Sequence, residues 1–399
     1  MNAYRIAIVH DWLTGMRGGE HVLEAMAELF PRAELFTLIY VPGRISPVLT
    51  ALKRHTSILQ RVPAIEKRYR SFLPVMPFCI ERFDLKGFDL VISSSHCVAK
   101  GIRKPTDALH ISYVHAPMRY MWDRYDDYFA PGHASLPVRI VAKLIRHRLQ
   151  NWDRLVSGKD RVDKLIANSK FIAGQIERAY GRRAEVIYPF VDFERFAKRQ
   201  RHPGRYYLMV GAMAPYKRID IAIEAFNKMR LPLIIVGSGQ NEEKLQKNAG
   251  PTVEFLGNLS DEAVADLYSK CKAFIFPGVE DFGIAPLEAM AAGAPVIAYA
   301  QGGLLETVTD KTGIFFDRQT ADGLIEAVSK YEEGKIVFSH EEIRDRARLF
   351  SRERFQRELV ETIKKMIIEV GKDPTLFLET VSSGWSFLAK SSVKSRSFS

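Results

Sequence analysis

The chain has 399 residues, 47% of them hydrophobic, and a formal net charge of +11. This length predicts two domains, because a single hydrophobic core rarely grows beyond about 250–300 residues. No run of about 18 apolar residues is present, which excludes a membrane-spanning helix, and the polar residues at positions 10–20 argue against a signal peptide.

In chain order, the first half alternates between strand-like and helix-like segments. Buried strands are predicted at 4–10, 88–95, 108–116 and 162–169, and helices at 20–30, 135–156 and 170–181. Ser169 and Gly181 are predicted to cap the last of these helices at its beginning and its end. Alternation of this kind is typical of a parallel sheet with helices on both faces.

The segment 197–205 is polar, charged and broken by Pro-Gly, and we predict that it links two domains. A second alternating set follows, with strands predicted at 206–212, 231–237, 253–257, 272–277, 294–300 and 312–317. The predicted fold class is α/β, with two doubly wound, Rossmann-like domains at 1–200 and 201–350. We expect a helix at 351–370 to complete the first domain, and a loose tail at 371–399.

The positive net charge fits three classes of partner: nucleic acid, an anionic membrane surface, or phosphorylated small molecules. The sequence contains no zinc-finger spacing and no RNP-type aromatic cluster, so we expect no nucleic-acid partner. Basic and apolar residues are interleaved at 54–74. This pattern fits a helix with a solvated basic face, and equally a segment that meets anionic lipid through Arg68 and Arg70.

The cysteines give no sign of a disulfide or metal framework. Cys79, Cys97 and Cys271 form no C-x-x-C pair and show no metal-ligand spacing. Reduced thiols in a reducing compartment are the expected state. We therefore expect a cytoplasmic protein. If segment 54–74 meets anionic lipid, the protein is expected to be peripheral on the inner face of the plasma membrane.

In a doubly wound sheet, ligands bind at the carboxyl ends of the strands, where loops lead into helix N-termini. Gly15, Gly18 and Gly19 follow the first strand, which suits close approach to a phosphate but also fits a tight turn. His115 lies at the end of the strand at 108–116, and Arg119 follows that strand. His115 fits a ligand contact or a satisfied core histidine, and Arg119 fits a phosphate contact or a carboxylate cap.

A basic pair opens a helix in the second half. Lys217 and Arg218 come shortly after the strand at 206–212. Cations at a helix N-terminus oppose the helix dipole. An anionic ligand therefore explains them better than the stability of the helix does.

Two acids flank a predicted helix start in the stretch EDFGIAPLEAM (280–290). Glu280 is placed in the loop, and Glu288 is placed in the helix among Leu, Ala and Met. An acid near a helix N-terminus favours the dipole, which explains Glu280 but explains Glu288 less well. Backbone N–H groups between the two acids are predicted to point into the same space: those of Phe282, Gly283 and Ile284.

Several other chemistries find little support in the sequence. D-x-D, H-x-x-x-H and G-x-S-x-G are all absent, so we expect no metal site and no serine nucleophile elbow. The glycine loop is not a G-x-G-x-x-G motif followed by an acid on the next strand, which argues against a nicotinamide dehydrogenase. We expect no cofactor.

Taken together, these motifs resemble the retaining nucleotide-sugar glycosyltransferases of family 4. EDFGIAPLE matches the E-x7-E signature of that family, and APYKRID, YVHAPMRYMWD, NSKFIAGQI, VIYPFVD and the early Gly-Gly loop match as well. The resemblance covers residues 4–370 and is nearest to bacterial mannosyltransferases that build O-antigen or exopolysaccharide repeat units. It implies the GT-B fold, in which two Rossmann-like domains face each other across a cleft.

The resemblance also implies roles for individual residues. Catalytic roles fall on His115, Lys217 and Glu280. Donor-binding roles fall on Gly18, Gly19, Lys217, Arg218, Asn258, Leu259, Phe282, Gly283, Ile284 and Glu288. Acceptor or membrane contacts are expected from Arg68, Arg70 and Arg119. The family's usual Arg five residues before Lys217 is replaced here by Ala212.

The implied activity is metal-independent transfer of a sugar from a nucleotide-sugar to a hydroxyl of a glycan acceptor, with retention. GDP-mannose is the first expected donor, and a polyprenyl-diphosphate-linked glycan is the expected acceptor, in bacterial surface polysaccharide assembly. A UDP-sugar-dependent transferase and a nucleotide-sugar epimerase on the same fold are the alternatives. A non-catalytic binding module also remains open, since Ala212 departs from the family pattern.

Overall fold

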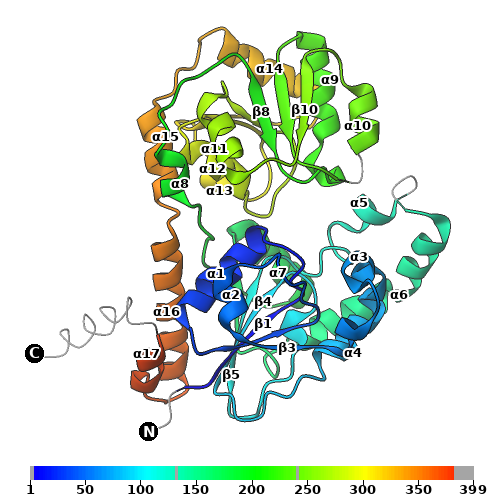
Figure 1. Cartoon of the computed structure of the whole chain (residues 1–399), viewed down its shortest axis with the longest axis vertical. Coiled ribbons are helices and arrows are strands. Elements are labelled where there is room, and N and C mark those ends of the chain that lie inside the picture. The colour runs from blue at the N-terminus through cyan, green and yellow to red at the C-terminus, as the bar shows by residue number, and fades with distance from the viewer. Residues whose placement is uncertain (1–3, 131–133, 240–241, 382–399) are drawn as a thin grey trace, which may run out of the picture. The chain divides into compact units, whose positions relative to one another are not determined.

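The computed structural model describes residues 4–130, 134–239 and 242–381, and the chain divides into two compact units. Unit 1 contains Met1–Ile187 and Glu353–Ser399, and unit 2 contains Tyr188–Arg352 (Figure 1). Each unit is built on its own parallel sheet. The predicted fold class of two doubly wound, Rossmann-like domains is confirmed.

The sheet of unit 1 has the strand order β3-β2-β1-β4-β5-β6-β7, with every pair parallel. The strands are β1 (Ile6–His10), β2 (Glu34–Thr37), β3 (Lys53–Thr56), β4 (Leu90–Ser95), β5 (Leu109–Val114), β6 (Lys164–Ala167) and β7 (Glu185–Val186). Every residue of β1, β4 and β5 is buried, as expected for central strands covered on both faces.

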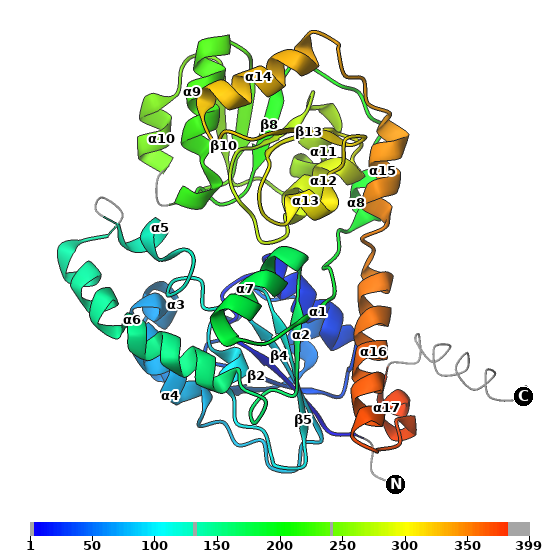
Figure 2. The same ribbon diagram turned by 180° about the vertical axis from the view of Figure 1, so that it is seen from behind.

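The helices of unit 1 cover both faces of its sheet. The α-helices are α1 (Gly18–Leu29), α2 (Pro47–Ala51), α3 (Ile65–Arg68), α4 (Met76–Ile80), α5 (Tyr125–Phe129), α6 (Leu136–Val156), α7 (Lys170–Tyr180), α16 (Arg352–Glu369) and α17 (Thr375–Thr380), and the 3₁₀ turns are η1 (Ile58–Arg61), η2 (Tyr69–Val75) and η3 (Ala99–Gly101). Figure 1 shows α1 and α2 in front of the sheet, and Figure 2, from behind, shows α7.

The sheet of unit 2 has the order β10-β9-β8-β11-β12-β13, also parallel throughout. The strands are β8 (Tyr207–Val210), β9 (Leu233–Val236), β10 (Val253–Gly257), β11 (Phe274–Phe276), β12 (Val296–Tyr299) and β13 (Gly313–Phe316). The helices are α8 (Phe193–Ala197), η4 (Pro215–Lys217), α9 (Ile219–Met229), α10 (Glu242–Asn248), α11 (Asp261–Lys270), α12 (Ile284–Ala291), α13 (Leu304–Thr307), α14 (Ala321–Glu332) and α15 (His340–Arg348).

Two apolar clusters lie on opposite faces of the unit 2 sheet. Tyr207 and Met209 pack in one cluster, while Leu208, between them, packs in the other. This alternation follows from the two-residue period of a strand, and it explains why these segments are apolar at every position. The strands predicted in both halves are confirmed, as are the helix cap at Ser169, which accepts from Ile172 N–H, and the left-handed Gly181.

The structure differs from the sequence-based boundaries in two places. The units divide between Ile187 and Tyr188 instead of at 200, because Val191, Phe193 and Phe196 pack into the core of unit 2. Residues 371–381 are not a loose tail, since α17 forms there with Phe377 fully buried; the predicted tail at 382–399 lies outside the described residues.

The basic segment 54–74 is also not one helix. It begins in β3 and continues through η1, α3 and η2, with Ala64 in the left-handed conformation ahead of α3. Pro74 lies within η2. Proline and a left-handed residue both interrupt a regular α-helix, which accounts for the difference.

A buried ion pair stabilises unit 1. Lys100 Nζ lies 2.7 Å from Asp153 Oδ1, and both side chains are fully buried. The other carboxylate oxygen accepts hydrogen bonds of 2.8 Å from Tyr180 Oη and Trp122 Nε1. These contacts join η3, α6 and α7 through one carboxylate.

Removing the cation should destabilise unit 1. We expect Lys100→Met to lower its free energy of unfolding by about 3–5 kcal/mol, because a buried carboxylate loses its partner. Urea unfolding followed by tryptophan fluorescence measures this, since unit 2 contains no tryptophan, whereas Trp12, Trp122 and Trp152 belong to unit 1. The double variant Lys100→Met/Asp153→Asn should recover part of the loss. An unchanged midpoint in Lys100→Met would contradict the stabilising role.

Candidate active site

The strand order of unit 2 changes direction between β8 and β11. The chain leaves β8 toward β9 on one side, and leaves β11 toward β12 on the other. The loops after β8 and β11 therefore diverge at the carboxyl edge of the sheet, which is where doubly wound sheets bind ligands. The loop after β8 contains Lys217, and the loop after β11 contains Glu280.

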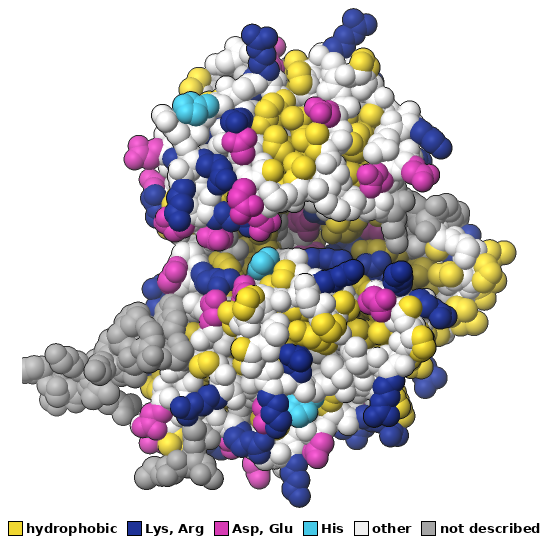
Figure 3. Space-filling view, in the orientation of Figure 1, with side chains coloured by type: hydrophobic (Ala, Val, Ile, Leu, Met, Phe, Trp, Pro, Cys, Tyr) yellow, Lys and Arg dark blue, Asp and Glu magenta, His cyan; other side chains and the backbone are white. Residues whose placement is uncertain are grey.

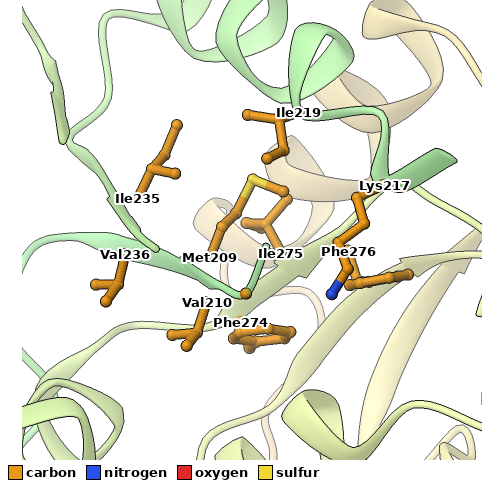
Figure 4. A pocket seen from close by; sticks show the side chains of 10 residues that line it. Met209, Val210, Lys217, Ile219, Ile235, Val236, Phe274, Ile275 and Phe276 are labelled. Atoms are coloured by element: carbon orange, nitrogen blue, oxygen red, sulfur yellow. The ribbon is translucent and has the colours of Figure 1, made fainter. Parts of the chain in front are cut away.

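An ion pair joins these two loops. Lys217 Nζ lies 3.1 Å from Glu280 Oε1, and the side chains are only 13% and 17% exposed. The loops approach so closely that a Cβ added at Gly278 would lie 2.6 Å from the Cα of Lys217. Figure 4 shows Lys217 beside the ring of Phe276 at the rim of a small pocket, with Nζ 5.7 Å from the ring centroid. Two predicted catalytic residues are thus brought together.

Gly211, at the end of β8, leaves room for the lysine. Its φ is +140°, and a Cβ there would lie 2.6 Å from Lys217 Nζ. The next residue, Ala212, is exposed and supplies no cation. Arg218 does not simply take over that role, because its guanidinium makes a two-point contact with Asp220, at 3.0 Å and 2.8 Å.

Glycines in a neighbouring loop hold the backbone of Glu280. Gly303 N–H donates to Glu280 O at 2.8 Å, and Glu280 forms an isolated parallel bridge with Gly302. Gly302 has a φ of +83°, and a Cβ at Gly303 would lie 2.3 Å from Asp281 O. Side chains at these glycines would displace the loop that carries Glu280.

Helix α12 follows directly and carries the second acid. Gly283 is its N-cap with a φ of +95°, and a Cβ there would clash with Leu304. The N–H groups of the first turn have no intrahelical acceptor, so the helix presents donors and a positive dipole end at the carboxyl edge. Phe282, by contrast, is 3% exposed and stacks with Tyr188, so its side chain serves the core.

Glu288 is held by a buried phenol. Tyr268 Oη donates to Glu288 Oε2 at 3.0 Å. Burial, and then the charge of Glu288, raises the pKa of Tyr268 well above its ordinary value, so the phenol remains a donor. Glu288, although it lies among apolar residues of α12, therefore has a hydrogen-bond partner on α11.

Asn258 and Leu259 lie at the end of β10, beside the end of β9. Asn258 Nδ2 donates to Ser238 Oγ at 3.0 Å. Leu259 is 37% exposed. Both belong to the carboxyl edge of the unit 2 sheet, on loops other than those of Lys217 and Glu280.

In unit 1, the order changes direction between β1 and β4. Gly18 and Gly19 form the first residues of α1, as predicted for a glycine loop that leads into a helix. A Cβ at Gly19 would lie 3.7 Å from the imidazole of His115. The structure therefore places the glycine loop and His115 side by side at the carboxyl edge of this sheet.

His115 is linked to a second histidine through one hydroxyl. Its Nε2 lies 2.8 Å from Ser94 Oγ, which lies 3.2 Å from His10 Nδ1. Burial, and then the nearby His96 and His10, hold the pKa of His115 well below its ordinary value. His115 is thus a neutral hydrogen-bonding group at neutral pH, and its tautomer is coupled to Ser94.

Asp11, which follows β1, organises the loop after β4. Its carboxylate accepts from the backbone N–H groups of His96 at 2.7 Å and Ala99 at 2.7 Å, and it lies 3.0 Å from His96 Nδ1. Burial opposes its ionisation, but His96, His10 and the N–H donors outweigh burial and lower the pKa of Asp11. A buried negative charge therefore fixes the loop beside His115.

The predicted acceptor arginines occupy different positions. Arg119 is partly buried and hydrogen-bonds Tyr128, while Arg68 and Arg70 are exposed around Tyr69. Arg70 lies over the Tyr69 ring at 5.4 Å. Arg119 also acts electrostatically on His115, which places it at the carboxyl edge of the unit 1 sheet.

Sequence reasoning missed several residues of these sites: His10, Asp11, Ser94, His96, Tyr268 and the pair Gly302–Gly303. The runs VHD at the end of the first strand and SSSH at the end of the strand at 88–95 are signals that could have found the first four. Tyr268 and the glycine pair lie on remote segments and become visible only in the fold. Within the described ranges, no group of three or more His, Cys, Asp or Glu side chains is arranged to hold a metal ion.

Two family models match the chain. Residues 16–195 match "Glycosyltransferase Family 4", and residues 190–350 match "Glycosyl transferases group 1". O-antigen chain mannosyltransferase C of Escherichia coli is 31% identical over 175 residues, covering 41% of this chain and 46% of that protein. The chain spans about half the length of the curated relatives it matches.

Solved structures share the fold. The lipopolysaccharide outer core galactosyltransferase WaaB aligns with a TM-score of 0.64 at 17% identity, covering 91% of this chain and 99% of that one. HepE of Anabaena, in complex with UDP and glucose, aligns with a TM-score of 0.63 at 16% identity, covering 90% and 99%. The two matched models together extend over residues 16–350, and with the shared fold they show that the chain belongs to the family-4 glycosyltransferases of GT-B fold.

Proposed function

We propose that the protein is a retaining, metal-independent glycosyltransferase that moves a sugar from a nucleotide-sugar to a hydroxyl of a glycan acceptor. The observation that supports this most directly is the Lys217–Glu280 pair at the switch point of unit 2. A cation and a carboxylate, held 3.1 Å apart beside a helix N-terminus, suit a ligand that carries both phosphates and hydroxyls.

The chemistry follows from the charge that develops. The bond between the sugar C1 and the diphosphate oxygen breaks, and its electron pair leaves with the diphosphate. Lys217 and the first-turn N–H groups of α12 stabilise that charge in an enclosed site. Glu280 accepts hydrogen bonds from hydroxyls of the donor sugar, and Glu288, steadied by Tyr268, accepts them from the ribose.

Retention requires the new bond to form on the face that the diphosphate leaves. The acceptor oxygen bonds to C1, and its proton passes to an oxygen of the departing diphosphate. In unit 1, neutral His115 and the N-terminus of α1 at Gly18 and Gly19 supply hydrogen-bond donors for the sugar and the phosphates. No protein nucleophile enters this scheme.

For the donor, GDP-mannose is the first proposal, and a UDP-sugar is the second. The first is supported by the likeness to a mannosyltransferase of O-antigen chains. The second is supported by the fold shared with a protein solved with UDP and glucose. We propose a polyprenyl-diphosphate-linked glycan as acceptor, at the cytoplasmic face of the plasma membrane, in surface polysaccharide assembly.

A donor screen tests the proposal. We expect GDP-mannose to raise the melting temperature more than UDP-glucose or an ADP-sugar does, because bound ligand stabilises the folded chain by mass action. The product of turnover with acceptor should keep the anomeric configuration of the donor, as measured by NMR. Release of epimerised sugar without acceptor would overturn the transferase in favour of an epimerase, and the absence of any donor-dependent shift would favour a module without this activity.

The neighbouring cations should differ in their effect on the donor. Lys217→Ala should weaken nucleotide-sugar binding by about 10- to 100-fold, since a hydrogen bond to a charged group contributes about 1.5–3 kcal/mol. Arg218→Ala is the matched control and should cost less, because that guanidinium is engaged with Asp220. Isothermal titration of both variants decides this. Equal losses would mean that Arg218 completes the diphosphate clamp in place of the arginine that the family has at the position of Ala212.

The pH profile tests the role of His115. Because its pKa is held well below the ordinary value, the neutral imidazole persists as the pH falls through 6.5, and kcat should show no histidine titration there. His115→Ala should lower kcat by about 100-fold through loss of a hydrogen bond to the reacting sugar. His147→Ala, on the exposed surface of α6, is the control. A wild-type kcat that falls with an apparent pKa near 6.5, and becomes pH-independent in His115→Ala, would contradict the neutral role.

A further inference from the structure

Helix α6 exposes an apolar stripe that the proposed reaction does not use. Large apolar side chains exposed along it are Leu136, Val138, Ile140, Val141, Leu144 and Leu155. Leu144 is 76% exposed and Leu155 is 72% exposed. Figure 3 shows hydrophobic side chains gathered at the outer end of this helix. A contiguous exposed apolar surface of this kind marks an interaction site.

Three of these residues define the apolar stripe, which lies on one side of the helix. Leu136, Ile140 and Leu144 are spaced four residues apart and therefore follow one line along the helix. Ala142 and Leu149, on the other side, are buried. The apolar stripe thus points away from the core of unit 1, and packing of α6 within that unit does not account for it.

The charge along α6 is of one sign. Residues 136–152 contain no Asp or Glu, but they contain Arg139, Lys143, Arg146, His147 and Arg148. Lys143 and Arg148 are exposed beside the stripe. An apolar stripe bordered by cations is the pattern of a helix that lies in a membrane interface, with apolar side chains among the acyl chains and cations among anionic headgroups.

We propose that α6 docks unit 1 on an anionic lipid bilayer, lying in the plane of the interface with Leu136, Ile140 and Leu144 inserted. In the part of the chain that the structure covers, no helix is long and apolar enough to cross a membrane. Tyr69 packs in the same apolar cluster as Ile145 of α6, so Arg68 and Arg70 belong to the same region of unit 1. The proposal rests on the proposed function only for its lipid-linked acceptor.

Flotation of the full chain with vesicles tests the proposal. Wild type should float with equimolar phosphatidylglycerol and phosphatidylcholine, but not with phosphatidylcholine alone. Ile140→Glu/Leu144→Glu should lower binding to the anionic vesicles by about 10-fold or more, because it places charge in the acyl region. Both positions are exposed and glutamate favours helix, so the fold should persist, which circular dichroism checks.

Matched variants separate the stripe from general effects. Val337→Glu/Leu349→Glu changes two other exposed apolar residues, both in unit 2, and it should float like wild type. Lys143→Glu/Arg148→Glu should lose anionic-vesicle binding, whereas the same charge change on α10, Lys244→Glu/Lys247→Glu, should lose less. Equal losses from the two charge-reversal pairs would overturn a specific role for α6.

Two further outcomes would overturn the proposal. One is undiminished flotation of Ile140→Glu/Leu144→Glu. The other is a wild-type protein that does not bind vesicles but self-associates through the same stripe, as measured by light scattering. The stripe would then be an interface between copies of the chain. Turnover with GDP-mannose and a water-soluble acceptor is measured in parallel. Normal flotation without turnover would contradict the proposed glycosyltransferase function but would still support docking of α6 on the bilayer.

Discussion

The contact between the loops after β8 and β11 is the constraint on which the unit 2 site depends. Gly278 lets the backbone of one loop approach Lys217 in the other, and Gly211 leaves space for the ammonium group. The resulting ion pair holds Glu280 at the carboxyl edge, while Gly302 and Gly303 hold its backbone from a third loop. Lys217 and Glu280 each neutralise the other until a ligand arrives, so neither charge stands alone in a partly buried place. In the proposed function, a diphosphate would compete for the lysine, and sugar hydroxyls would compete for the carboxylate.

The carboxyl edge of the unit 1 sheet has a different arrangement of polar groups. The carboxyl edge of the unit 1 sheet, beside α1, contains the buried carboxylate of Asp11. Backbone N–H groups and His96 already bind this carboxylate. His115 itself is neutral, and a hydrogen-bond chain links it through Ser94 to His10. The two units therefore offer complementary environments: formal charge in unit 2, and oriented neutral donors with a helix N-terminus in unit 1.

The sequence allowed the strands, the domain count and the Lys217 and Glu280 loops to be predicted, because buried parallel strands are apolar throughout and glycines mark the loops after them. It did not reveal β2 and β3: β3 is the basic edge strand Lys53–Thr56, and neither has a long apolar run. Tyr268 as partner of Glu288 was hidden because twenty residues and two elements separate them. The boundary at 187 was displaced because the polar stretch 197–205 looks like a linker, whereas the aromatic residues just before it already pack in unit 2. Periodicity reports local structure, and these features are long-range.

The return of the chain to unit 1 has a consequence for how the protein is made. Phe355 packs fully buried against Tyr113, Gln356 donates to Ala25 O at 2.9 Å, and Thr362 Oγ1 donates to Glu185 at 2.8 Å. Unit 2 is one uninterrupted stretch, so it can close on itself as soon as it leaves the ribosome. Most of unit 1 precedes unit 2 in the chain but lacks α16 until unit 2 has been synthesised, so its sheet keeps an uncovered apolar surface during that time. Of these two units, the one that is synthesised first is thus completed last.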